Sequence, residues 1–228
     1  MENPPVNKKV SWKAVGKIII GILILPAIFF LTAWTFKYWQ AWLYLAVIFL
    51  PAAFVLVYFA RNDPAFLNRR MQFKEPEVEQ KKIVSFSAVP LILQFVLPGL
   101  DVRFGWSRLP DSIVLLGAAL TLLGYIIVIL TFMKNRFASR VIVVEEGQKV
   151  ITTGPYKLVR HPMYFGTILL YTFSPLALGS YWAVIPALFM IPVLVYRIIN
   201  EEEVLKRDLP GYIEYTEKTR YRLIPGLW

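Results

Sequence analysis

The chain of 228 residues has no cysteine and only one histidine, His161. Without cysteine it can form neither a disulfide bond nor a thiolate metal site, and one histidine speaks against structural zinc. The glycine-rich pattern G-x-G-x-x-G, which marks the strand-to-helix turn of a dinucleotide-binding domain, is also missing. We therefore expect no metal site and no Rossmann domain.

Charged residues are scarce as well. They make up 18% of the chain, against 57% hydrophobic residues and a mean hydropathy of +0.54, a composition typical of membrane proteins. The net charge of +10 could suggest nucleic acid as a partner, but the sequence has no basic helix or zinc finger. The basic residues lie between apolar runs, where they indicate membrane topology instead.

Five uncharged stretches predict the membrane helices. They cover residues 18–36, 38–60, 83–100, 112–133 and 161–196. Each of the first four fits one crossing of roughly 20 residues, and the first lacks the cleavage site of a signal peptide. The fifth, with 36 residues, would be ~54 Å long as one helix, against a hydrocarbon core of ~30 Å. It must therefore fold back, and we place the break between Ser174-Pro175 and Gly179-Ser180.

The fold class predicted is thus all-α, an integral membrane bundle of about six transmembrane helices with a C-terminal helical hairpin. Lysine and arginine number 4 before the first span, 6 in residues 61–82, 6 in residues 134–160 and 6 from Arg197 onward, whereas only Lys37, Arg103 and Arg108 lie on the opposite side. The positive-inside rule then places both termini in the cytosol of a multi-pass protein.

Two regions follow from this pattern. Residues 1–134 hold the N-terminal transmembrane helices, with an interfacial helix and loop at 61–82. Residues 135–228 begin with a loop whose Glu145-Glu146-Gly147 resembles a hairpin tip. After Tyr196 we expect a polar extension of the last helix, a break at Pro210-Gly211 and a helical continuation through Tyr212 and Tyr215. This C-terminal part forms a small cytosolic cap.

Two polar clusters flank the apolar hairpin. In the first, RHPMY, Pro162 favours an extended His161 and starts the next helix, so that Arg160 and His161 meet the first-turn N–H groups. In the second, Arg197 and Glu201 are four residues apart on one helical face. Each cluster alone also fits a membrane-flanking turn or a surface ion pair. The hairpin brings both to one end, which favours a site for a polar or anionic ligand.

Three segments carry a family resemblance: TTGPYKLVRHPMYFG, RIINEEEVL and GYIEYTEKTRYRLIPG. Their order and spacing resemble the C-terminal catalytic region of the isoprenylcysteine carboxyl methyltransferase family and its bacterial phospholipid-methyltransferase-like relatives. The resemblance covers roughly residues 135–228. The first four spans resemble that family only in hydropathy.

The resemblance implies S-adenosylmethionine as cofactor. It implies Arg197 as the substrate-binding arginine and Glu201 as an acid that binds the cofactor and takes part in catalysis, with Glu202 beside it. The segment that precedes the RHPMY motif would make mainly backbone contacts. The remaining cofactor-binding residues implied are Gln148, Lys149, Val150, Ile151, Tyr156, Arg160, His161, Pro162, Met163 and Tyr164.

The chemistry of this cofactor fits residues of both charges, because it carries a carboxylate, an ammonium, a ribose diol and a sulfonium. An acceptor carboxylate is ionised at pH 7 and needs no base, so Arg197 would only orient it. A lipid amine must first lose a proton, for which Glu201 or His161 would be the base. We therefore predict O-methylation of a prenyl-cysteine-like or other lipophilic carboxylate that enters between the helices. Lipid N-methylation and a small lipophilic thiol remain open.

Two other functions are considered for this sequence. A sterol-reductase-like oxidoreductase would have a similar C-terminal region, but the chain is short for it. A transporter or non-catalytic membrane protein predicts charges midway through the spans and inverted symmetry between the halves, whereas the ionisable residues lie at span ends. The partners expected are membrane lipid and a lipophilic or lipidated acceptor, with no nucleic acid. The oligomeric state stays open.

Overall fold

The computed structural model describes residues 12–70, 78–138, 144–145 and 147–228, and every regular element in these ranges is a helix. The all-α prediction is confirmed. Three elements are short: α3 (Pro64–Arg70), the 3-10 helix η1 (Gly154–Lys157) and α8 (Tyr212–Lys218). The long helices are α1 (Trp12–Ala33), α2 (Trp39–Asn62), α4 (Val78–Phe104), α5 (Asp111–Lys134), α6 (Pro162–Ala177) and α7 (Val184–Asp208).

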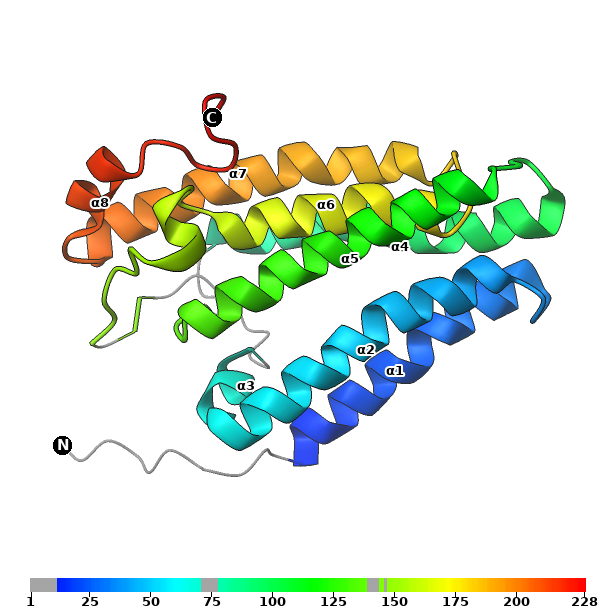
Figure 1. Ribbon diagram of the computed structural model, residues 1–228, viewed down its shortest axis with the longest axis horizontal. Coiled ribbons are helices and arrows are strands. Elements are labelled where there is room, and N and C mark those ends of the chain that lie inside the picture. Colours follow the sequence, from blue (N-terminus) through cyan, green and yellow to red (C-terminus); the bar gives the residue numbers. More distant parts are fainter. Residues whose placement is uncertain (1–11, 71–77, 139–143, 146) are drawn as a thin grey trace.

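The long helices form an elongated bundle (Figure 1). Helices α4, α5, α6 and α7 lie side by side along its long axis, and α1 and α2 form a pair packed on α4 and α5. The three turns at residues 34–38, 105–110 and 178–183 meet at one end. Helix α3, the segment before α6 and helix α8 gather at the other end, which we call the cap end.

Among the described residues, four helices are long and apolar enough to cross a membrane. They are α2, residues Ser85–Phe104 of α4, α5 and α7. The apolar part of α1 that is described, Ile20–Ala33, is shorter, and α6 has 16 residues. About six membrane helices were predicted. The described residues contain six long helices, and four of these have full spanning length.

The predicted hairpin of residues 161–196 is confirmed as α6 and α7, but the break comes later than expected. Pro175 lies inside α6, which continues to Ala177, and Gly179 makes the turn with a φ of +76°. Proline lacks only the N–H that would bond to the preceding turn, and membrane helices tolerate this loss where neighbours compensate. Ser174 Oγ donates to Leu170 O at 2.6 Å, whereas the helical bond that Pro175 cannot make would be to Tyr171 O.

Helices α5 and α6 approach until their backbones touch. A Cβ on Gly124 would lie 2.5 Å from Gly166 O, and one on Gly166 would lie 2.6 Å from Gly124 O. Further along, a Cβ on Gly117 would lie 2.6 Å from Ala177 N. Small residues permit this close packing of membrane helices. The contact fixes α6, whose first turn carries His161, against α5.

At the end of the bundle opposite the cap, hydrogen bonds fix the turn of the α6–α7 hairpin to neighbouring helices. The buried Asp101 of α4 accepts from the hydroxyl of Ser107 at 2.7 Å and from that of Ser180 at 2.5 Å. Tyr38 donates to Leu178 O at 2.5 Å. The α6–α7 turn is thereby tied to α4 and to the start of α2.

The cap follows the expected course. Helix α7 runs to Asp208, the chain turns through Pro210 and Gly211, and α8 resumes at Tyr212. Before η1, Gln148 N donates to Glu145 O at 3.0 Å, and Gly147 has a φ of +75°, which makes a turn where the hairpin tip was expected. Glu146 of that tip and residues 71–77 of the predicted interfacial segment lie outside the described residues, and α3 is a helix within that segment.

Candidate functional site

The RHPMY motif adopts the expected local structure. His161 is the N-cap of α6 with a φ of −124°, and Pro162 begins the helix. Arg160 and His161 are both buried, and their backbone N–H groups donate to Tyr221 O and Arg222 O at 2.9 Å. The C-terminal segment is therefore pinned alongside the start of α6.

Glu202 is the buried centre of this region, with 1% of its surface exposed. Arg160 Nε donates to its Oε1 at 2.6 Å, and His161 Nε2 lies 3.2 Å from the same oxygen. Arg222 Nε donates to Oε2 at 3.0 Å. A buried carboxylate is stable only with such compensation. Glu202 thus connects α6, α7 and the C-terminal segment.

Arg160 has structural partners as well. Its Nη1 donates to the carbonyl oxygens of Thr219 and Arg220 at 2.9 and 2.8 Å, in addition to the Glu202 contact. Arg160 and Glu202 therefore connect the C-terminal segment of the cap to α6 and α7.

A second group joins the two arms of the hairpin. The Tyr164 hydroxyl donates to Glu201 Oε2 at 2.5 Å, and Arg197 Nε donates to the Tyr164 oxygen at 3.0 Å. Tyr164 is buried, whereas Arg197 and Glu201 are half-buried. The rings of His161 and Tyr164 meet edge to face, with centroids 5.7 Å apart. The convergence of the two predicted clusters is confirmed.

The predicted cofactor residues in the loop before α6 lie partly in the buried region and partly outside it. Tyr156 lies in η1, where its hydroxyl accepts from Asn135 Nδ2 at 2.9 Å and its carbonyl accepts from the Tyr215 hydroxyl at 2.8 Å. Burial raises the pKa of Tyr156. Val150 and Tyr156 pack against the buried cluster of Leu209, Tyr212 and Tyr215.

Other predicted residues lie at the margin. Gln148 Oε1 accepts from Glu145 N at 3.0 Å within its own turn, and Lys149 is exposed. Ile151 and Met163 are half-buried, and Met163 packs against Tyr164 and Ile198. Side chains of Gln148 and Lys149 are therefore not part of the buried cluster.

Sequence reasoning does not name Arg222 as part of this region, and it gives Tyr212 only a place in the helical continuation of the cap. Arg222 shares Glu202 with Arg160, and Tyr212 is a buried residue of α8. Both lie in the last segment that carries the family resemblance, but nothing in its spacing shows which side chains turn inward.

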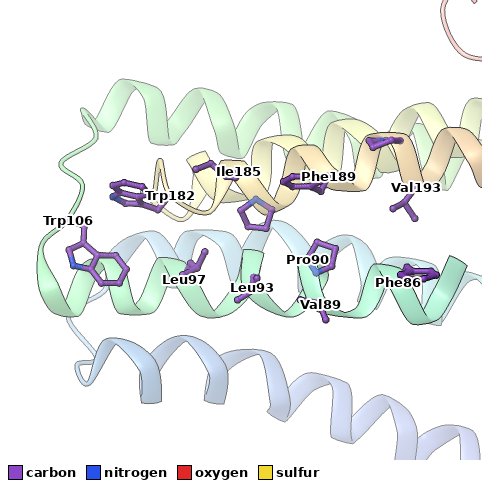
Figure 2. Close-up of a pocket in the computed structure, with 12 residues that line it drawn as sticks. Phe86, Val89, Pro90, Leu93, Leu97, Trp106, Trp182, Ile185, Phe189 and Val193 are labelled. Atoms are coloured by element: carbon purple, nitrogen blue, oxygen red, sulfur yellow. The ribbon is translucent and has the colours of Figure 1, made fainter. Parts of the chain in front are cut away.

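An apolar groove lies between α4 and α7, with a volume of about 600 Å³ (Figure 2). Trp106 and Trp182 stand at one end, and Phe86 and Val193 at the other. Arg197 follows Val193 by four residues, or about 6 Å of helix, so the groove ends one turn before the polar cluster. The remaining lining residues are Val89, Pro90, Leu93, Leu97, Ile185, Pro186, Phe189 and Pro192.

A comparison with protein families gives a match for the region that contains these clusters. Residues 112–209 match the family model of phospholipid methyltransferases. This part of the chain is similar to the phospholipid methyltransferase family. It comprises α5, α6 and α7, and with them Arg160, His161, Tyr164, Arg197, Glu201 and Glu202. A search of curated proteins found no match.

The match agrees with the resemblance expected from the sequence and supports a membrane methyltransferase of the lipid or isoprenylcysteine type. The methyltransferase family implies S-adenosylmethionine as methyl donor. Helix α8 and the C-terminal segment lie beyond the matched residues, although they pack on the matched site through Arg160 and Glu202. Within the described ranges, no group of three or more His, Asp or Glu residues is placed to hold a metal ion.

Proposed function

We propose that the protein uses S-adenosylmethionine to methylate the carboxylate of a prenyl-cysteine-like or other lipophilic acceptor. The observation that carries this proposal is the Tyr164, Glu201 and Arg197 cluster, which joins both arms of the hairpin at one end of an apolar groove. A polar reaction centre beside a groove for a hydrocarbon chain is what an amphipathic acceptor requires.

The donor set at the cap end fits the cofactor. Glu201 offers a half-buried carboxylate for its ammonium, and His161 and Tyr164 offer polar groups from a buried surface. Tyr156 and the backbone of residues 148–151 line the neighbouring loop. When bound, S-adenosylmethionine supplies a methyl group on a positively charged sulfur. Arg160 and Glu202 bind each other and thereby stabilise the positions of these residues.

Arg197 orients the acceptor. A guanidinium holds a carboxylate in a defined plane, and the carboxylate is already ionised at pH 7, so no base is needed. The groove between α4 and α7 holds the hydrocarbon chain, with its polar end one turn further along α7 at Arg197. Positioning nucleophile and methyl carbon about 3–3.5 Å apart away from water supplies most of the rate enhancement.

The charge distribution supports an orientation in the membrane. The described parts of the lysine- and arginine-rich segments lie at the cap end, with α3, η1 and α8 (Figure 1). The positive-inside rule puts this end, with both termini, in the cytosol. The acceptor's polar group then meets the cofactor at the cytosolic surface.

A transfer assay tests the proposed function. Purified protein is incubated with methyl-labelled S-adenosylmethionine and either a prenyl-cysteine analogue or phosphatidylethanolamine. Label released by base from the prenyl-cysteine product identifies a methyl ester and supports the proposal. Base-stable label in the phospholipid instead identifies N-methylation, with Glu201 or His161 as base, and contradicts it.

Variants assign the residues. Arg197→Ala should lose transfer to the carboxylate acceptor while it still binds the cofactor. Glu203→Ala is the matched control, because Glu203 lies on the same helix with an exposed side chain. Equal loss in both variants would show that the helix, and not the Arg197 guanidinium, carries the effect.

A further inference from the structure

Tyr212 is a buried residue of the cap, in the same cluster as the loop residues of the proposed cofactor site. It is the first residue of α8, follows Gly211 with a φ of +83°, and is only 4% exposed. The left-handed turn at Gly211 brings α8 back onto α7, which an L-residue with a side chain would resist. The Tyr212 ring packs in the cluster that includes Val150 and Tyr156.

The hydroxyl of Tyr212 is buried without a hydrogen-bond partner in the described part of the chain. Its neighbours differ in this respect. Tyr215 donates to Tyr156 O, Tyr156 accepts from Asn135, and Tyr164 donates to Glu201. Buried hydroxyl groups are paired in most folded proteins, so an exception calls for an explanation.

Charge around this hydroxyl connects it to the site. Glu202, Glu201 and Arg160 all lie within electrostatic range of the Tyr212 phenol. Burial, and after it the two carboxylates, raise the pKa of Tyr212, so the group stays protonated at neutral pH and can donate. The Tyr212 ring thus belongs to the cluster on which Val150 and Tyr156 pack, and the two carboxylates of α7 are part of its electrostatic surroundings.

We infer that the Tyr212 hydroxyl is a binding contact for the polar part of S-adenosylmethionine and donates to one of its oxygens. This inference rests on the proposed function, because it assigns the donor to the same proposed cofactor site. It extends the site beyond the matched region, to α8. The ribose diol and the carboxylate of the cofactor both offer acceptors for a phenol.

The test compares Tyr212→Phe with the wild type by calorimetric titration with S-adenosylmethionine and with S-adenosylhomocysteine. The variant keeps the ring and loses only the hydroxyl. We expect the Kd for both to rise 5- to 10-fold, while the unfolding temperature of the ligand-free protein stays equal or increases. Removal of an unpaired buried hydroxyl does not cost the ligand-free protein a hydrogen bond.

Tyr215→Phe is the matched contrast, because its hydroxyl is paired with Tyr156 O. This variant should unfold at a lower temperature without ligand. A Kd for Tyr212→Phe within twofold of the wild type overturns the inference. So does weaker binding that comes with a loss of stability like that of Tyr215→Phe. If the wild type itself binds neither ligand, the proposed function fails first, and the inference with it.

Discussion

The hydroxyl of Tyr164 donates a 2.5 Å hydrogen bond to Glu201, across 37 residues of sequence and the full length of the α6–α7 hairpin. Arg197 donates to the same hydroxyl at 3.0 Å. Tyr164 thus touches both the proposed cofactor-binding acid and the proposed acceptor-binding arginine.

Tyr164→Phe should therefore lower kcat/KM for methyl transfer by about 10² while the fold remains, because both neighbours lose the group that orients them. The ring still fills its place between α6 and α7. Steady-state kinetics and thermal unfolding measure the two effects. Full activity in this variant would show that the Tyr164 hydroxyl does not position Glu201 or Arg197.

Glu202→Gln should destabilise the protein by about 3–5 kcal/mol, because it leaves the buried cations Arg160 and, in part, Arg222 without their counter-charge. Glu203→Gln, on the exposed side of the same turn, should stay within about 0.5 kcal/mol of the wild type. Chemical denaturation in detergent measures both. Similar free energies of unfolding for the two variants would remove Glu202 from the centre of the cap.

Gly124→Ala should lower stability by about 1–3 kcal/mol, since the new methyl group would push into Gly166 O and force α5 and α6 apart. Cofactor affinity should fall as well, because α6 carries His161 at its start. Gly21→Ala is the control: it meets no atom within 4 Å and improves helix propensity. Thermal unfolding decides, and a Gly124 variant as stable as the Gly21 variant would contradict the close packing.

Leu93→Trp should fill part of the groove between α4 and α7 and raise KM for a prenyl acceptor about tenfold, with an unchanged Kd for the cofactor. Leu116→Trp, an exposed position on α5 outside the groove, serves as control. Kinetics with acceptors of increasing chain length measure the effect. If both variants keep the wild-type KM, the acceptor chain binds elsewhere.

The cap should lose stability at alkaline pH. Burial raises the pKa of Tyr215 to about 12 from about 10 in an unfolded chain. A pKa raised by folding contributes stability that is complete below pH 10 and disappears as the pH rises through 12. Unfolding followed between pH 9 and 12 checks this, with Tyr215→Phe as reference. A variant with the same loss over that range would show that Tyr215 does not contribute.

Much of the architecture follows from the sequence because it depends on lengths and periodic patterns. The 36-residue apolar stretch had to fold back, and the fold-back alone brings Tyr164 to Glu201. Only the second half of the predicted break, with Gly179, is the turn, since Pro175 lies inside α6. Local composition does not show that a proline is accommodated within a membrane helix.

Long-range side-chain partners could not be predicted. Glu202 binds Arg160, which precedes it in the sequence, and Arg222, which follows it. The groove forms between α4 and α7, whose residues are about a hundred positions apart. These contacts depend on helix rotation within the bundle, which an apolar helix with hydrophobic residues on all sides does not encode in its pattern.

Calorimetric binding of S-adenosylmethionine to the wild type, Glu201→Gln and Glu203→Gln tests the central claim most directly. The account predicts that the wild type and the Glu203 variant bind alike and that the Glu201 variant binds at least tenfold more weakly. Equal affinity in all three proteins would contradict a cofactor site at the open end of the hairpin.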